Sequence, residues 1–144
     1  MKNEFSPIGI VHNDIKEKKR FEAADLVSEI EVYPQYAEGM DGLEAFSHIV
    51  VIFQFHMIRD NERTALKTHP RMDTSIPLQG VFATRSPYRP NPIGVTACRL
   101  VKKEGNRLTV SGLDAIDGTP VLDIKPYIPE AFSPKEIKLA DWLK

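Results

Sequence analysis

The sequence predicts a mainly β protein, folded as a small antiparallel β-barrel that is closed or nearly closed and carries short helical pieces. Apolar residues recur at every second position in several segments, which is the period of a β-strand. Helical periodicity is weak along the whole chain. Six or more short strands with little helix favour a closed sheet, because closure removes exposed edges.

Two strands are predicted near the start of the chain, at residues 5–11 and 28–33. In the second, Ile30 and Val32 share one face and the intervening glutamates share the other. Residues 49–55 are apolar at all but one position, which is typical of a strand that is buried on both faces.

The second half of the chain contains three more strands. Residues 95–101 and 108–113 flank a hairpin turn at residues 104–106. A strand follows at residues 121–125, and its two charged side chains share a face, where we expect them to form an ion pair.

Helical signals are confined to one turn at residues 41–46 and a piece at residues 134–142, which has proline at its first position. The intervening polar segment, residues 59–77, is predicted to be a loop. Loops of this length in a small domain are usually functional or disordered.

The chain has 144 residues, the size of one domain with one core. It has no apolar run of the roughly 20 residues that a membrane span requires, and no signal-peptide core. Its single cysteine, Cys98, has no internal disulfide partner and lies in a strand pattern, so we expect a buried, unreactive thiol. A single-domain cytoplasmic protein without a membrane partner is predicted.

The net charge of −1 gives no positive excess of the kind that nucleic-acid binders carry. Two local basic clusters are interpreted as solvated surfaces rather than phosphate tracks: Lys16, Lys18, Lys19 and Arg20, and Arg99, Lys102, Lys103 and Arg107.

Metal and Rossmann-type nucleotide chemistry are not predicted. His48 and His56 lie eight strand residues apart, about 26 Å, which is too far for one ion. His12 and His69 have no partner at ligand spacing. No two glycines have the G-x-G spacing of the Rossmann phosphate loop.

The segment at residues 80–94 combines a strand-like run at 81–83 with two arginines, Arg85 and Arg89, and three prolines. Proline fixes its own φ and extends the residue before it, so the arginines lie on a stiff loop. We interpret this loop as a ligand-gripping element. A rigid connection between strands is the alternative.

Polar groups also stand at strand ends. His56 closes the apolar strand, Arg85 follows residues 81–84, and residues 114–120 join two strands through an Asp117-Gly118 turn. Strand ends at one rim of a barrel lie side by side, so these groups can converge. A simple hairpin turn remains the other interpretation of residues 117–120.

Three blocks of the sequence resemble the signature segments of the TrmO/YaeB (TsaA-like) family: residues 42–56, 80–101 and 114–129. The resemblance covers residues 8–129 approximately and leaves a tail at 130–144. It implies a small non-Rossmann β-barrel that uses S-adenosyl-L-methionine to methylate N6 of a threonylcarbamoyl-modified adenosine beside the tRNA anticodon. It also implies a homodimer with the cofactor near the subunit interface.

The resemblance implies contacts with the cofactor but assigns no catalytic residue. Arg85 would grip the methionine carboxylate, and Asp117 would accept from a ribose hydroxyl or the ammonium group. Tyr88, Arg89 and Asn91 on the stiff loop would meet the RNA or the partner subunit. The implied cofactor-binding residues are His56, Met57, Arg85, Val95, Asp117, Gly118, Thr119 and Pro120.

Two features depart from the family pattern. Members usually carry a Pro-Arg-Gln-like segment after the first strand that contacts the cofactor. Here residues 18–25 contain neither proline nor glutamine, which leaves Glu22, Ala23 and Ala24 as weak candidates. The C-terminal extension of the longer bacterial members is also absent from this sequence.

Two other functions remain open. The barrel could bind or sense S-adenosyl-L-methionine without catalysis. It could instead bind RNA without a cofactor, in the manner of oligonucleotide-binding folds. Tight cofactor binding without turnover would favour the cofactor-binding module. RNA binding without affinity for the cofactor would favour the RNA-binding barrel.

Overall fold

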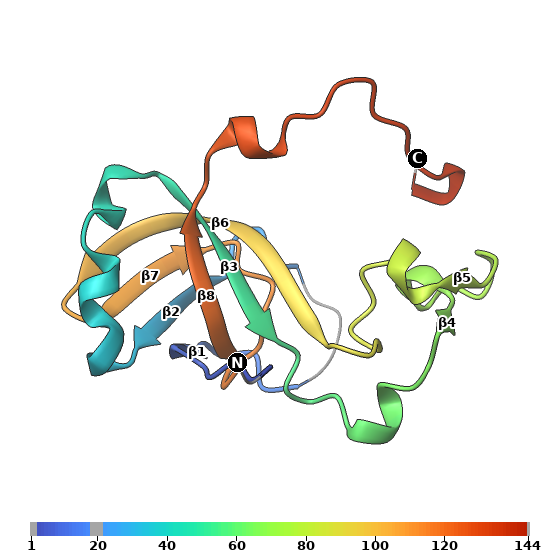
Figure 1. Cartoon of the computed structure of the whole chain (residues 1–144), viewed down its shortest axis with the longest axis horizontal. Coiled ribbons are helices and arrows are strands. Elements are labelled where there is room, and N and C mark those ends of the chain that lie inside the picture. The colour runs from blue at the N-terminus through green and yellow to red at the C-terminus, as the bar shows by residue number, and fades with distance from the viewer. Residues whose placement is uncertain (1–2, 18–21, 144) are drawn as a thin grey trace.

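In a computed structural model, which describes residues 3–17 and 22–143, six strands close into an antiparallel barrel as predicted (Figure 1). Around the barrel the order is β1-β2-β7-β6-β3-β8. The bounds are Gly9–His12 (β1), Val27–Val32 (β2), His48–Gln54 (β3), Ile93–Glu104 (β6), Arg107–Ser111 (β7) and Pro120–Pro126 (β8). A separate sheet pairs Lys67–Thr68 (β4) with Gln79–Gly80 (β5).

Alternating side chains fill the barrel. In β2, Ile30 and Val32 are buried, whereas Glu29 and Glu31 are half-buried, which confirms the predicted alternation. Strand β3 is buried at three successive positions, 49–51, which confirms burial on both faces for this part of the predicted strand, whereas Ile52 is half-buried. The largest fully buried side chains are Phe53, Ile30, Ile49, Leu108, Leu113, Val11, Val32, Val51, Val81, Val110 and Val121.

The predicted hairpin between β6 and β7 is confirmed, although β6 begins two residues earlier than expected and extends further. Gly105 adopts a φ of 57°, a conformation that glycine reaches at little cost. The side-chain amide of Asn106 donates to the carbonyl of Val32 at 2.8 Å, so the turn is tied to the end of β2.

Short 3₁₀ helices differ from several predictions. The predicted turn at 41–46 occurs as η2 (Leu43–Ala45), and η1 (Pro34–Met40) precedes it without having been predicted. The predicted strand at residues 81–83 is wrong, because these residues form η5 (Val81–Ala83). The cause is Thr84, whose hydroxyl and N–H both donate to the carbonyl of Val81, at 2.8 and 3.1 Å.

The predictions for the two chain ends also need correction. The first strand begins at Gly9, not at residue 5. No helix covers residues 134–142 of the described chain; a short η6 (Pro129–Phe132) precedes this stretch, and η7 (Asp141–Leu143) lies at its end. Residues 130–141 are exposed, so no packed face stabilises a helix there.

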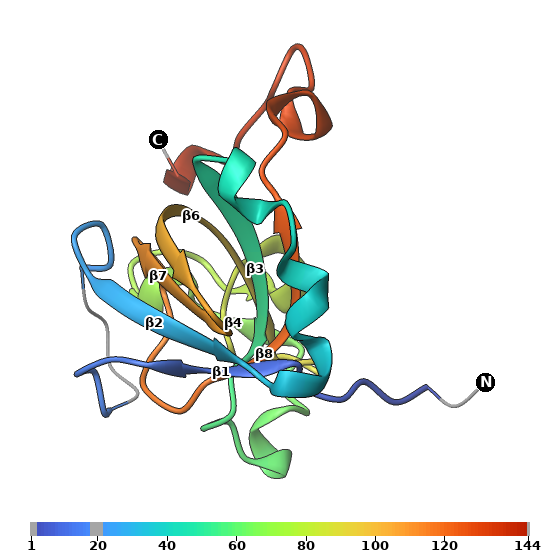
Figure 2. The same ribbon diagram turned by 90° about the vertical axis from the view of Figure 1, so that its left-hand side faces the viewer.

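Residues 59–84 form an ordered excursion at one side of the barrel (Figure 1). It contains β4, β5, η3 (Asp60–Glu62) and η4 (Pro70–Met72) besides η5, so the polar segment at 59–77 is more than a plain loop. The tail after β8 arches over the barrel and returns to this excursion, where the guanidinium of Arg71 lies 6.0 Å from the ring centroid of Trp142. Helices η1 and η2 lie on the other side of the barrel (Figures 1 and 2).

Several strand ends meet at one rim of the barrel. Strand β3 ends where β6 and β8 begin, since Gln54 pairs with Ile93 and Phe53 with Val121. The start of β8 also pairs with β1, through Pro120 and Ile10. We call this end of the barrel, with residues 12–16, 54–57, 93–95 and 112–120, the site rim. None of the described helices is long and apolar enough to span a membrane.

Candidate functional site

The site rim brings His56 and the 117–118 turn together from distant parts of the sequence. His56 follows β3, and its Nε2 lies 3.6 Å from the point where a β-carbon on residue 118 would stand. Gly118 has a φ of 83°. Partial burial lowers the pKa of His56 below its ordinary value of 6.5, and the negative charge of Asp117 partly offsets this effect. A neutral imidazole therefore faces the turn at physiological pH.

Asp117 ties the β7–β8 loop to the segment after β1. One carboxylate oxygen accepts from Lys16 Nζ at 2.8 Å and the other from the N–H of Asn13 at 3.0 Å. These two bonds hold the pKa of Asp117 below its ordinary value. The N–H of Asp117 donates to the carbonyl of Ile15 at 2.7 Å. A ligand that binds Asp117 would contact a carboxylate that Lys16 and Asn13 already hold in place.

The remaining predicted residues of this turn have structural contacts. Thr119 is buried, and its hydroxyl donates to the carbonyl of Ile116 at 2.7 Å. Pro120 begins β8 and pairs with Ile10. Met57, next to His56, is 47% exposed. Thr119 is therefore buried, whereas His56, the 117–118 turn and Pro120 are half-buried and Met57 is exposed.

Arg85 and Val95 lie around a cavity of about 540 Å³ beside this corner. Phe55, the neighbour of His56 in the chain, also lines it, so the cavity and the His56 corner adjoin. Val95 is 45% exposed and pairs with Ile52. The cavity is lined by Phe53, Phe55, Phe82, Thr84, Arg85, Arg89, Pro90, Asn91, Ile93, Gly94, Val95, Thr96 and Asp114.

The two arginines of the stiff loop differ in their contacts. Arg89 Nη1 donates to the carbonyls of Thr84 and Ser86, each at 3.1 Å, so its guanidinium braces the loop. Arg63 adds a second brace, because its Nε donates to the carbonyl of Pro90 at 2.8 Å. Arg85 is exposed, and no hydrogen bond or ion pair joins it to another described residue. Of the two arginines of the stiff loop, only Arg85 is therefore an open cation, that is, a charged side chain with no hydrogen-bond or ion-pair partner among the described residues.

Asp114 is a cavity residue that the sequence interpretation did not select. Its carboxylate, like the guanidinium of Arg85, forms no hydrogen bond or ion pair with the described part of the chain. Asp114 is exposed, yet desolvation by the surrounding chain raises the pKa of its carboxyl group above the ordinary value. The sequence analysis included Asp114 in the turn segment at residues 114–120. The turn pattern gave no reason to assign Asp114 a role different from that of Asp117.

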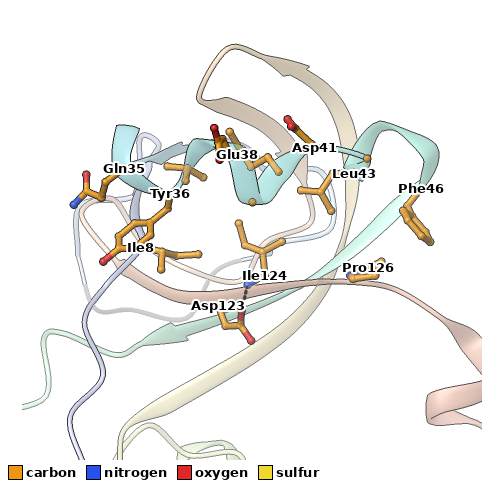
Figure 3. Close-up of a pocket in the computed structure, with 14 residues that line it drawn as sticks. Ile8, Gln35, Tyr36, Glu38, Asp41, Leu43, Phe46, Asp123, Ile124 and Pro126 are labelled. Carbon is orange, nitrogen blue, oxygen red and sulfur yellow. Dashed lines mark hydrogen bonds between the residues drawn. The ribbon is translucent and has the colours of Figure 1, made fainter.

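A second cavity, of about 610 Å³, lies away from the site rim between η1, η2 and β8 (Figure 3). Figure 3 shows Tyr36, Glu38 and Asp41 on one wall and Asp123 on the other. Asp123 Oδ2 pairs with Lys125 Nζ at 2.9 Å, which confirms the predicted ion pair, although both side chains are largely exposed. None of the predicted cofactor-binding residues lines this cavity.

Two further predictions concern the segment before β2. Residues 18–21, including Lys18, Lys19 and Arg20 of the first basic cluster, lie outside the described residues. Within 22–24, Ala24 approaches the site rim, because its carbonyl oxygen is 3.7 Å from the β-carbon position of Gly112. Among the described residues, no group of three or more His, Cys, Asp or Glu could hold a metal ion.

The fold and this rim define a class: small closed antiparallel barrels with a polar site built from strand ends, distinct from Rossmann enzymes. A sequence model of the tRNA-methyltransferase O N-terminal domain matches residues 14–132. The chain belongs to this family.

Curated relatives and solved structures agree with the assignment. The chain is 43% identical over 145 residues to a probable S-adenosyl-L-methionine-binding protein of Pyrococcus abyssi, covering 97% of this chain and 76% of the relative. It is 48% identical over 98 residues to a tRNA (adenine(37)-N6)-methyltransferase of Mus musculus, covering 68% of this chain and 22% of the relative. The crystal structure of TrmO from Pseudomonas aeruginosa matches with a TM-score of 0.73 and 35% identity, over 96% of this chain. The chain spans 61% of that solved chain.

Proposed function

We propose that this protein is an S-adenosyl-L-methionine-dependent methyltransferase that acts on N6 of an adenosine in the tRNA anticodon loop. The observation that carries the proposal is the approach of His56 to Gly118 at the site rim, next to a cavity lined by the open cation Arg85, in a chain of the tRNA-methyltransferase O family. The named activity of the mouse relative supports the acceptor class. Threonylcarbamoyl-modified adenosine is the expected acceptor.

The donor set fits the proposed cofactor. A neutral imidazole at His56 and a carboxylate at Asp117 tolerate a sulfonium, whereas Arg85 matches a carboxylate at the other end of the cofactor. When bound, S-adenosyl-L-methionine supplies an electrophilic methyl group. The proposed cofactor contacts are His56, Met57, Arg85, Val95, Asp117, Gly118, Thr119 and Pro120. Tyr88, Arg89 and Asn91 are proposed to lie toward the acceptor or a partner subunit.

The test is transfer of a labelled methyl group to tRNA from a strain that lacks the corresponding modification, followed by mass spectrometry of the nucleosides. We expect label on N6 of one adenosine in the anticodon loop. Folded protein that binds the cofactor but modifies no tRNA would contradict the proposal.

The second candidate is a module that binds S-adenosyl-L-methionine without catalysis. The archaeal relatives favour it, because they carry the name of cofactor-binding proteins and the chain covers 76% of the Pyrococcus abyssi protein and 88% of an Archaeoglobus fulgidus one. Calorimetry that shows tight cofactor binding, together with no turnover on any tRNA pool, would establish this candidate instead.

We also propose that the protein works in the cytoplasm as a homodimer whose interface adjoins the cofactor. Sedimentation equilibrium across a range of protein concentrations tests the dimer. A monomer at concentrations where the enzyme is active would contradict it.

A further inference from the structure

We propose that the 540 Å³ cavity receives the adenine ring of the methyl acceptor, and that the carboxylate of Asp114 accepts a hydrogen bond from its N6–H group and takes the N6 proton. This inference rests on the proposed function and names the acceptor subsite and the base, neither of which the family resemblance assigned.

The cavity wall contains two charged side chains that have no partner among the described residues. Arg85 and Asp114 both line the cavity, and neither forms an ion pair or hydrogen bond with another described residue. The described chain has several ion pairs elsewhere, for example those of Asp117 with Lys16 and of Asp123 with Lys125. With Arg85 proposed to hold the carboxylate of the cofactor, the carboxylate of Asp114 remains available to a second ligand that can donate a hydrogen bond.

Aromatic side chains also line the cavity. Phe82 lies in the cavity wall and is 78% exposed, so its ring is accessible to a ligand. Phe55 lies in the same wall, packed edge-to-face on Phe53 with a centroid distance of 5.3 Å. Proteins that bind an unstacked base usually place its ring against aromatic side chains. The cavity thus offers a stacking surface next to a hydrogen-bonding edge.

Among the charged groups at and beside the site rim, Asp114 is the one suited to the N6 group. Both oxygens of Asp117 already accept hydrogen bonds. Arg85 and Arg89 can only donate, and an adenine amino group needs an acceptor. Asp114 is the carboxylate that lines this cavity. An ionised carboxylate accepts from an exocyclic amine and does not compete with it as a donor.

The chemistry balances with the proposed cofactor as co-reactant. The N6–CH₃ bond forms while the bond from the methyl group to the sulfonium breaks, and its electron pair remains on sulfur as a neutral thioether. The N6 proton passes to the Asp114 carboxylate and then to water. Desolvation by the surrounding chain raises the pKa of Asp114, which makes it a better proton acceptor than an ordinary exposed carboxylate.

The kinetic test uses Asp114→Asn, which keeps the shape and removes the charge. We expect kcat on tRNA to fall about 100-fold or more, with unchanged melting temperature and unchanged affinity for S-adenosyl-L-methionine in calorimetry. Asp41→Asn, on the far side of the barrel, is the control and should retain wild-type kcat. Full activity in Asp114→Asn would overturn the inference, as would loss of cofactor affinity, which would place Asp114 on the cofactor instead.

A binding test separates this inference from the proposed function, because it needs no turnover. Anticodon stem-loop RNA is made with threonylcarbamoyl-adenosine or with its N6-methylated form, which has no N6 hydrogen to donate, and is titrated into the protein saturated with S-adenosylhomocysteine. We expect wild type to prefer the RNA with the N6 hydrogen about fivefold to tenfold, and Asp114→Ala, which has no acceptor oxygen, to lose most of the preference. Equal affinity of wild type for both RNAs would overturn the inference. A wild type that discriminates in binding but never transfers methyl would contradict the proposed function alone.

Discussion

The imidazole of His56 lies directly against the backbone of Gly118, with Nε2 3.6 Å from the position of a β-carbon on residue 118. The N–H of Gly118 donates to the carbonyl of Val11 at 2.8 Å, so the turn that carries this contact is anchored to β1. Three strands, β1, β3 and β8, therefore determine where the imidazole and the turn meet. The contact leaves little freedom for change at either residue.

Gly118→Ala should destabilise the protein by about 1–2 kcal/mol, because a φ of 83° is costly for any residue with a β-carbon. It should also weaken cofactor binding, since the new methyl group would face His56. Urea unfolding and calorimetry measure the two effects.

Gly39→Ala is the matched control for this substitution. Gly39 lies in η1, and its β-carbon would meet nothing within 4 Å. We expect unchanged or slightly higher stability and unchanged cofactor affinity. If Gly118→Ala and Gly39→Ala changed the free energy of unfolding and the cofactor affinity equally, the turn at residue 118 would not be specifically strained.

The two arginines of the stiff loop should separate into a ligand contact and a structural brace. Arg85→Ala is expected to change the free energy of unfolding by less than about 0.5 kcal/mol while cofactor affinity falls. Arg89→Ala should cost about 1–3 kcal/mol, because two backbone carbonyls lose a charged donor. Urea unfolding compared with calorimetry separates the effects, and a large stability loss in Arg85→Ala would contradict the division.

Local pattern was enough to predict the barrel strands, because one side of each strand faces a core. In β2, Ile30 and Val32 alternate with glutamates. In β6 burial also alternates around Cys98, although Val95 and Val101 on the outer side are apolar and exposed. The error at Val81 has a different origin. An apolar run of three residues carries no period, and a hydrogen bond from Thr84, outside the run, determines that it turns.

The site was predicted less completely, because sequence does not reveal which charges are already paired. Arg85 and Arg89 occupy the same stiff loop, yet one is open and the other braces the backbone. Asp114 and Asp117 occupy the same turn, yet the first lines the cavity and the second is bound by Lys16. The Asp117 pairing joins residues 101 positions apart. The Arg89 contacts are local, three and five residues away, but they depend on the exact course of the loop backbone.

The ion pair of Lys16 and Asp117 should contribute to stability in a pH-dependent way. The folded-state pKa of Asp117 is lowered, so the contribution is fully present above the ordinary value of 3.8 and is lost as the pH falls through the lower, folded-state value. Lys16→Met should therefore cost less than about 1 kcal/mol at pH 7 and nothing at strongly acidic pH. Urea unfolding between pH 2 and pH 7 measures the difference, and a pH-independent loss would contradict the assignment to this pair.

Cys98 should be inert in the native protein. The side chain is 2% exposed, and burial raises its pKa to about 12. The reactive thiolate is therefore scarce at pH 8. Iodoacetamide should label Cys98 only as fast as the protein unfolds, and urea should accelerate the labelling. Stoichiometric labelling of folded protein within minutes would contradict the burial of this thiol.

His56 should make cofactor binding depend on pH through the charge of the sulfonium. Its pKa lies below 6.5, so the imidazole is neutral at pH 7 and becomes cationic only as the pH falls through that lower value. A cationic His56 would repel the sulfonium of S-adenosyl-L-methionine but not the neutral thioether of S-adenosylhomocysteine. Affinity for the first should fall by up to about tenfold per pH unit below the His56 pKa, whereas affinity for the second should change less. Calorimetry from pH 5 to pH 8 tests this, with His56→Gln as the variant that cannot gain the charge. Parallel curves for the two ligands, or an unchanged difference between them in His56→Gln, would show that His56 does not face the sulfonium.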